Sequence, residues 1–104
     1  MTHQFDVFKN PRDKVRFPYL LLVQHDVLST LPVRVVVPLT PQAAYGDRPI
    51  ARLNPVFRVE GVPVVMLTQL LGAIAPGSLG RRVATLDSKR SEIIAALDIV
   101  FSGI

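Results

Sequence analysis

The two histidines are the first side chains to test for acid–base chemistry. His3 and His25 do not lie at a characteristic spacing from a serine, aspartate or glutamate that would make either a general base. We expect His3, close to the first residue, to face solvent. His25 directly precedes Asp26, and such a pair is typical of a turn. The histidines therefore give little support to catalysis.

The sequence also lacks the patterns of a metal, cofactor or nucleotide site. It contains no cysteine, which excludes thiol catalysis and cysteine-ligated metal centres. Neither a P-loop nor a G-x-G-x-x-G motif is present. The eight acidic residues show no spacing that predicts paired carboxylates. We therefore expect no metal and no cofactor.

One class of enzyme stays open, the metal-free ribonucleases built on small β-barrels. These enzymes can stabilise charge at the scissile phosphate with arginine, threonine or serine side chains. The candidates here are Arg34, Arg58 and Thr68. The alternative for the two arginines is an ordinary exposed position on an alternating strand.

The charge balance favours an anionic partner without identifying it. Twelve basic and eight acidic residues give a net charge of +4, and nine of the basic residues are arginine. Only Arg81-Arg82 and Lys89-Arg90 are adjacent, and no aromatic platform for single-stranded nucleic acid accompanies them. An acidic partner protein fits at least as well as nucleic acid.

Length and composition predict one folded domain over residues 1–104. Hydrophobic residues make up 49% of the chain, which excludes an intrinsically disordered protein. A chain this short buries only about two-thirds of its unfolded surface, so the apolar excess favours a dimer. The N-terminal residues lack a signal-peptide pattern, and the uncharged stretch 61–80 contains prolines and glycines. We expect a cytoplasmic protein without a membrane span.

The apolar pattern predicts mostly antiparallel strands. They cover residues 4–8, 19–23, 33–37, 56–59 and 62–67. Glu60-Gly61 indicates a hairpin, and Pro63 places the start of the next strand at an edge or a bulge. Residues 40–55 are expected to be irregular, with one helical turn around residues 42–44.

The C-terminal segment predicts one amphipathic helix of about fourteen residues. Its proposed apolar stripe consists of Leu86, Ile93, Ile94, Leu97, Val100, Phe101 and Ile104. Asp87 is the expected N-cap, and Glu92 suits the positive end of the helix dipole. Gly103 lies where a helix can end with a left-handed residue. The expected fold is therefore mainly β with a C-terminal α-helix.

Short motifs spread over nearly the whole chain share the register of one family. Val23-Gln24-His25-Asp26 is similar to a family V-Q-S-D, and residues 34–39 (RVVVPL) are similar to R-M-V-I-P-L. The last four residues, FSGI, are similar to F-W-G-I. Other matches in step are Gln4-Phe5, Pro55-Val56 and Met66-Leu67-Thr68. The sequence resembles the CcdB family, the toxins of CcdA/CcdB toxin–antitoxin pairs.

The resemblance implies a homodimer of SH3-like barrels with antiparallel sheets, a fold shared by CcdB and MazF toxins. It implies a toxin of a type II toxin–antitoxin system that binds the GyrA subunit of DNA gyrase. The paired helix ends would enter the GyrA dimer and trap the cleaved DNA. Such a toxin is not an enzyme, because it makes and breaks no bond. Its other partner would be an acidic, partly disordered CcdA-like antitoxin, and DNA would be contacted only indirectly.

The resemblance also implies which residues face gyrase. They are Val27 and Leu28 on a loop, and Asp98, Phe101, Ser102, Gly103 and Ile104 at the helix end. The alternative roles are packing onto the sheet for Phe101, a helix cap for Gly103 and a frayed terminus for Ile104.

Three departures from the family pattern concern the expected site and the loop before it. Ser102 replaces the family tryptophan, Asp98 replaces an asparagine, and His25 replaces a serine. Serine has no ring to stack on a target arginine. Three interpretations stay open: an inactive toxin that is retained to bind an antitoxin, a gyrase with a different surface, or a different target. A MazF-like endoribonuclease is the alternative function.

Overall fold

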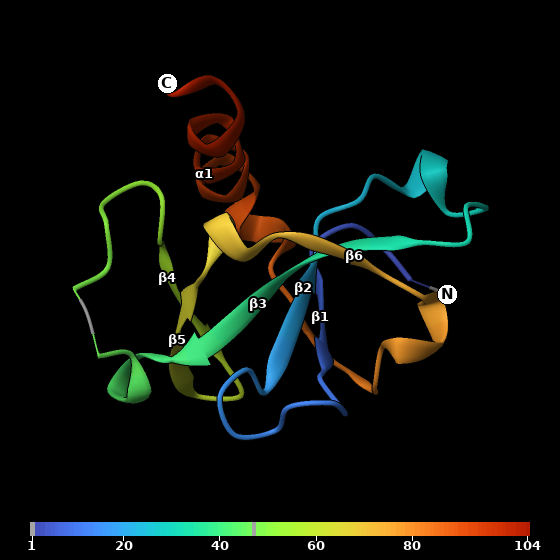
Figure 1. The fold of residues 1–104 in the computed structure, drawn as a ribbon, viewed down its shortest axis with the longest axis horizontal. Helices are drawn as coiled ribbons and strands as arrows, with labels where there is room; N and C mark the ends of the chain where they lie inside the picture. The colour runs from blue at the N-terminus through green and yellow to red at the C-terminus, as the bar shows by residue number, and fades with distance from the viewer. Residues whose placement is uncertain (1, 47) are drawn as a thin grey trace.

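An antiparallel sheet and one C-terminal helix form the fold, as the computed structural model shows for residues 2–46 and 48–104 (Figure 1). The strands are β1 (Asp6–Lys9), β2 (Tyr19–Leu22), β3 (Arg34–Pro41), β4 (Val56–Val59), β5 (Val62–Met66), β6 (Gly72–Ile74) and β7 (Arg82–Thr85). Five 3₁₀ turns connect them: η1 (Asp26–Leu28), η2 (Gln42–Ala44), η3 (Thr68–Leu70), η4 (Pro76–Ser78) and η5 (Asp87–Lys89). The helix α1 covers Arg90–Ser102.

The long strand β3 organises the sheet. The strand order is β4-β5-β3-β2-β1-β7, and β6 pairs with the first part of β3, where Arg34 lies opposite Ile74. The second part of β3 pairs with β5, where Leu39 lies opposite Met66. Every pair is antiparallel, and the sheet forms a half-barrel that is open between β4 and β7. The prediction of a mainly β fold with a C-terminal helix is confirmed.

Both faces of the central strands are covered, which explains the unbroken apolar run in β2. Leu21 packs in the larger core, whose fully buried members include Phe5, Leu39, Met66 and Ile93. The other face of the same strands forms a smaller core of Phe8, Leu20, Leu22 and Val36. Ile74 and Leu79 pack against that second core. The interpretation of residues 19–23 as a buried strand is confirmed.

The hairpin between β4 and β5 has the predicted two-residue turn. Glu60 and Gly61 both have positive φ, at 52° and 78°, which suits the twist of the flanking strands. Val59 and Val62 close the turn. Pro63 lies opposite Arg58 of β4, and the pairing of β5 with β3 on its other side ends at Val64. The missing N–H of Pro63 therefore removes no hydrogen bond between strands, which agrees with its predicted position at an edge.

One expectation about the helix is wrong. Asp87 is not its N-cap, because the 3₁₀ turn η5 intervenes and α1 begins after Lys89, without a side-chain cap. The Asp87 N–H instead donates to Thr85 Oγ1. The proposed apolar stripe is buried only in its first half, since Val100, Phe101 and Ile104 are exposed. The thirteen residues of α1 extend beyond the sheet that they pack on.

The strands β6 and β7 have no counterpart among the predicted strands. Both are short, and β7 begins at Arg82 within a pair of arginines. No helix among residues 2–46 and 48–104 is long and apolar enough to cross a membrane.

Candidate functional site

The last turn of α1 stands clear of the body of the protein (Figure 1). Ile93 and Ala96 anchor the first half of the helix in the core with no exposed surface. Beyond them the helix meets little, and Phe101 is 71% exposed and Ile104 77% exposed. Phe101 therefore does not pack onto the sheet. Exposed apolar side chains at a projecting end add nothing to folding and are typical of a binding surface.

Gly103 ends the helix in the way its position predicts. Its φ is 77°, and its N–H donates to the main-chain oxygen of Ile99 at 3.0 Å. An added Cβ would meet no atom within 4 Å, so only the backbone conformation demands glycine. Gly103 is thus a helix cap, and its turn also directs Ile104 away from the helix.

Two polar contacts hold the helix end. The Ser102 hydroxyl donates to the main-chain oxygen of Asp98 at 2.7 Å, so its polar group is turned back onto the helix. Arg52, in the connection between η2 and β4, donates to the main-chain oxygen of Ile104 at 3.4 Å. Arg52 itself has a positive φ of 69°, an uncommon conformation for a residue with a side chain. Asp98 is exposed on the same turn.

The second group of expected site residues lies on η1. Val27 is 75% exposed, and Leu28 is also exposed. His25 caps this turn, because its Nδ1 accepts the Val27 N–H at 3.0 Å. Gln24 holds the base of the loop, since it donates to the Leu28 oxygen and accepts the Val35 N–H. The interpretation of His25 as a turn residue is confirmed.

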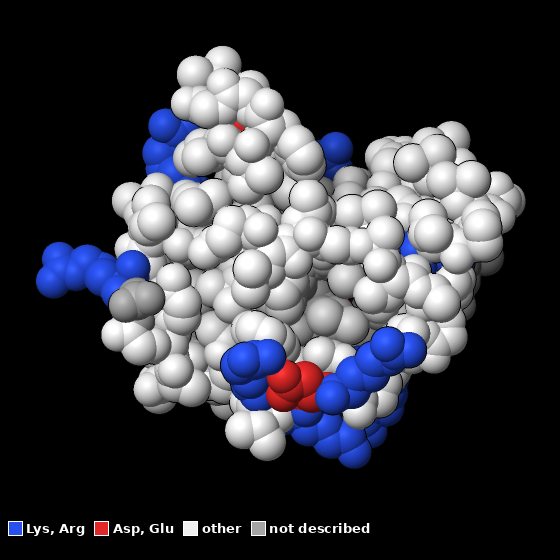
Figure 2. Space-filling model, viewed as in Figure 1, with Lys and Arg blue, Asp and Glu red and all other residues white. Residues whose placement is uncertain are grey.

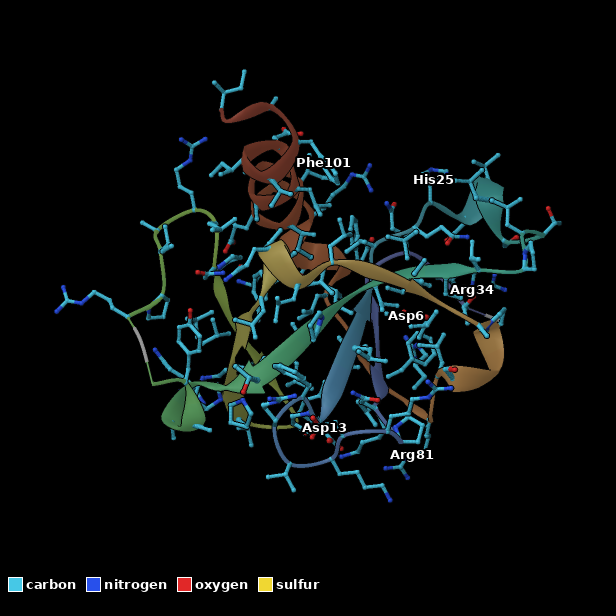
Figure 3. The ribbon with its side chains drawn as sticks, in the orientation of Figure 1. Asp6, Asp13, His25, Arg34, Arg81 and Phe101 are labelled. Carbon is cyan, nitrogen blue, oxygen red and sulfur yellow. The ribbon has the colours of Figure 1, made fainter. Side chains whose placement is uncertain are left out.

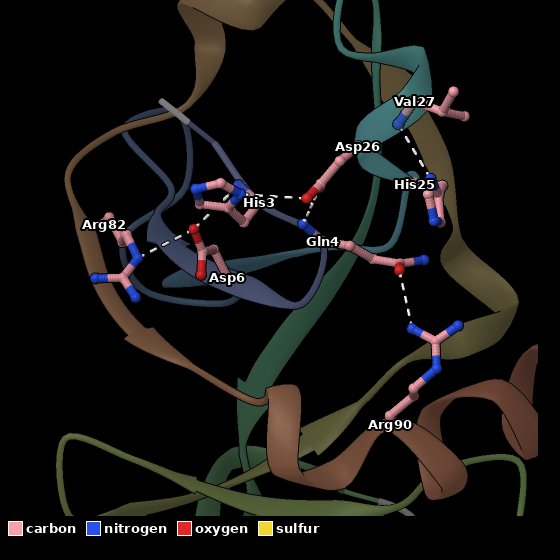
Figure 4. Close-up of polar contacts among 8 residues, drawn as sticks. All are labelled: His3, Gln4, Asp6, His25, Asp26, Val27, Arg82 and Arg90. Atoms are coloured by element: carbon pink, nitrogen blue, oxygen red, sulfur yellow. Dashed lines mark hydrogen bonds and ion pairs between the residues drawn. The ribbon is translucent and has the colours of Figure 1, made fainter.

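Asp26 ties this loop to the N-terminal segment (Figure 4). Its Oδ1 accepts the Gln4 N–H at 2.6 Å, and its Oδ2 lies 3.2 Å from His3 Nδ1. These two hydrogen bonds, the one from Gln4 first, lower the pKa of the Asp26 carboxyl below its ordinary value. The exposed His3 is thus placed as expected, but it also contributes to the anchoring of the loop.

Gln4 connects the loop to the start of the helix. Its side-chain oxygen accepts a hydrogen bond from Arg90 at 3.1 Å, and its side-chain nitrogen donates to the Val23 oxygen. The Arg90 guanidinium lies 5.3 Å from the centre of the Phe5 ring. Next to this contact the buried Asp6 accepts from the His3 N–H and pairs with Arg82 at 3.0 Å. This polar network therefore links the loop with Val27 and Leu28 to the start of α1, whereas the expected site residues of the helix lie at its other end.

The loop and the helix end form two protrusions on the same side of the molecule. Figure 3 shows His25 on one protrusion and Phe101 on the other, and the surface between them is hollowed (Figure 2). Val27 and Leu28 are therefore not in contact with the helix end within one chain. Sequence reasoning missed the residues that hold the two protrusions, namely Gln4, Asp26, Arg52 and Arg90. The V-Q-x-D motif was the available signal, because Gln24 and Asp26 are its polar members.

The basic side chains gather at a different end of the molecule. In Figure 2 lysine and arginine atoms concentrate around the region that Figure 3 marks with Asp13 and Arg81, whereas both protrusions are largely uncharged. Lys9, Lys14 and Arg81 line a cavity of about 410 Å³ there. Lys9 pairs with Glu60 at 3.0 Å, which raises the pKa of Lys9. The hydrogen bond from the Tyr19 hydroxyl first, and that from Lys9 second, lower the pKa of Glu60.

The three residues considered for RNA cleavage do not come together within one chain. Thr68 is fully buried, and its hydroxyl donates to the Leu53 oxygen. The Arg34 guanidinium donates to the main-chain oxygens of Ser29, Leu31 and Val33, so it braces a loop. Arg58 lies on β4, opposite Pro63 of β5. Arg34 lies in a different part of the sheet, at the start of β3 and opposite Ile74 of β6. Within residues 2–46 and 48–104, no cluster of three or more potential metal ligands occurs.

Comparison with known proteins gives one family and, among the similar folds, two mycobacterial endoribonucleases. The family model described as CcdB protein matches residues 4–103. An endoribonuclease in complex with its cognate antitoxin, from a mycobacterial species, superposes with a TM-score of 0.76 at 13% identity, over 97% of this chain and 95% of that chain. A second mycobacterial endoribonuclease has a TM-score of 0.74 at 14% identity, over 96% and 90%. At such identities these two structures establish the fold alone.

Proposed function

The chain belongs to the CcdB family of toxins from toxin–antitoxin systems, and we propose that it acts by binding the GyrA subunit of DNA gyrase. It would trap the enzyme while the DNA is cleaved and so prevent religation. The toxin itself makes and breaks no bond. The action is therefore inhibition by binding, and its strength depends on how well the two surfaces fit.

The exposed end of α1 is the observation that carries this proposal. Phe101 and Ile104 project where they contribute nothing to the core. Burial of each side chain in a partner is worth roughly 1.5–3 kcal/mol. The helix supplies a base for them, and the Gly103 cap and the Arg52 contact stabilise its end. Such preorganisation lowers the entropic cost of binding.

A symmetric dimer would present two copies of this end to the two-fold GyrA assembly. The second protrusion, with Val27 and Leu28, would contact the target beside the helix end. Because every contact is made twice, a favourable side chain counts twice in affinity. The loss of the family tryptophan at Ser102 likewise counts twice. We therefore propose that the natural target is a gyrase whose surface suits a small residue at this position.

The second partner of the proposed toxin is an acidic antitoxin. The net charge of +4 favours association with an acidic chain by long-range attraction. The similar mycobacterial endoribonuclease was solved with its cognate antitoxin, which supports an antitoxin partner for this fold. The basic end around Lys14 and Arg81 would attract such a chain before specific contacts form.

An endoribonuclease activity is the second candidate, favoured by the folds of the two mycobacterial enzymes. The chain offers little for it, since Thr68 is buried and the Arg34 guanidinium is occupied by main-chain oxygens. The groove of a dimer could still bring together other arginines. RNA cleavage is therefore tested beside gyrase.

Deletion of Gly103 and Ile104 tests the proposal in cells. Expression of the intact toxin without antitoxin should arrest growth, and the shortened chain should not. Its thermal unfolding should stay close to that of the intact chain, because both residues are exposed and the loss of the Gly103 cap frays only the last turn of α1. A shortened toxin that still arrests growth would contradict the proposed role of the helix end.

A further inference from the structure

The open side of the half-barrel contains a groove that the proposed gyrase contact does not use. It lies between the edge strand β4 and the corner where β7 runs into η5, and its volume is about 580 Å³. Val56, Phe57 and Arg58 form one wall, and Leu86 and Lys89 form the other. The residues of the helix end and of η1 take no part in it.

The strand β4 offers free main-chain groups to this groove. Among the described residues it has a strand neighbour, β5, on one side only. Phe57 lies opposite Val64 and Val59 opposite Val62, on the two sides of a two-residue hairpin, so these are the hydrogen-bonded pairs. The Met66 N–H donates to the Pro55 oxygen, so Pro55 and Met66 form the next hydrogen-bonded pair, two residues further from the turn. The alternation therefore directs the N–H and C=O groups of Val56 and Arg58 away from β5.

The side chains of the groove suit an acidic strand. Arg58 and Lys89 are its charged lining residues, and both are basic. The Arg58 guanidinium makes one bond, to the Gly61 oxygen at 3.2 Å, and keeps other N–H groups for a ligand. The exposed Val56 adds apolar surface on the same strand. An extended segment that alternates acidic and apolar residues would match both the backbone and the charges.

We propose that this groove binds an acidic, extended peptide segment as an additional strand on β4. Main-chain hydrogen bonds to Val56 and Arg58 would supply register, and pairing with Arg58 and Lys89 would select for carboxylates. In the proposed function the natural donor is the acidic antitoxin, so to that extent the inference rests on that function. The groove is remote from Phe101, and binding there leaves the helix end accessible.

A synthetic peptide tests the groove directly. The probe is an acetylated ten-residue peptide of alternating valine and glutamate, added to the full chain at low ionic strength. We expect calorimetric binding, with amide exchange of Val56 and Arg58 slowed at least about tenfold. The same peptide with every backbone nitrogen methylated has no N–H donor on either edge and should bind at least about tenfold more weakly. A valine–lysine peptide should not bind.

Charge reversal locates the site. The double variant R58E/K89E should lose at least about tenfold in affinity for the valine–glutamate peptide. The matched control R12E/R48E also reverses two exposed basic residues, both outside the groove, and should bind the peptide with an affinity within about twofold of the unaltered chain. Equal loss in both variants would mean non-specific attraction and would overturn the proposal. So would equal binding of the methylated peptide, or protection of Val56 without peptide at rising protein concentration, which would show a second copy on this edge.

Gyrase trapping by the same variants keeps the two ideas separate. If R58E/K89E traps gyrase normally but does not bind the peptide, both proposals are supported. If the unaltered chain binds the peptide at β4 but traps no gyrase, the proposed function fails while the groove assignment stands. If gyrase is trapped and no peptide binds, the groove assignment alone is wrong.

Discussion

Gln4 and Asp26 join two segments that are 22 residues apart, through a 2.6 Å hydrogen bond from the Gln4 N–H to Asp26 Oδ1. The same glutamine accepts a hydrogen bond from Arg90 at the start of α1. Gln4 therefore links the loop with Val27 to the start of the helix that carries Phe101. This junction adds to the core packing of Ile93 and Ala96 in fixing the relative placement of the two protrusions.

This junction should weaken at low pH. The pKa of Asp26 is below its ordinary value, so the charged form is favoured by folding. The resulting stabilisation is complete above the ordinary pKa of about 4 and is lost as the pH falls through the lower pKa of the folded protein. A pH titration of the Gln4 amide proton by NMR should show this midpoint. The Asp26→Asn variant should show no such transition, whereas a midpoint at or above 4 in the unaltered chain would disprove the coupling.

Phe101→Ala should reduce binding without reducing stability. Because the side chain is 71% exposed, the free energy of unfolding should change by less than about 0.5 kcal/mol. Truncation of a central aromatic residue in an interface costs about 2–4 kcal/mol, or roughly 30- to 1000-fold in affinity. Calorimetric titration with GyrA measures this loss. Val15→Ala is the matched control, since Val15 is 87% exposed at the basic end and should have no effect on binding.

Substitutions of Gly103 should separate backbone conformation from bulk. Valine at a φ of 77° is strained by about 1–2 kcal/mol, although nothing lies within 4 Å of an added Cβ. Gly103→Val should therefore fray the last turn of α1 and weaken GyrA binding. Asparagine tolerates the left-handed conformation, so Gly103→Asn should retain most of the binding. If the two variants behave alike, the role of Gly103 is not conformational.

Ser102→Trp should increase affinity for a gyrase that suits the family tryptophan. A ring that stacks on an arginine contributes about 0.5–2 kcal/mol, and a dimer gains it twice. We expect a gain of at least about fivefold for a standard laboratory gyrase. Ser102→Ala removes the bond to the Asp98 oxygen without adding a ring, and it should give no gain. A tryptophan variant that binds no better would show that the target lacks the stacking partner.

Local patterns predicted the elements that local forces determine. The β-branched run at residues 33–37 predicted the central strand, Glu60-Gly61 predicted the hairpin, and Gly103 predicted the helix end. The predicted N-cap at Asp87 was wrong because Asp87 belongs to the 3₁₀ turn η5, which precedes the helix. Apolar spacing predicted the helix but not where its packing on the core ends, so the exposure of Phe101 was implied by the family resemblance and not by the apolar pattern. Contacts such as that of Arg52 with Ile104 join distant segments and have no local signature.

A DNA cleavage assay is the most direct test of gyrase poisoning. Supercoiled DNA is incubated with the toxin and ATP, once with gyrase from the organism that encodes the chain and once with a standard laboratory gyrase. We predict that linear DNA accumulates with the toxin's own gyrase and that Phe101→Ala abolishes this accumulation. If neither gyrase is trapped, and the chain instead cleaves RNA, gyrase poisoning is contradicted.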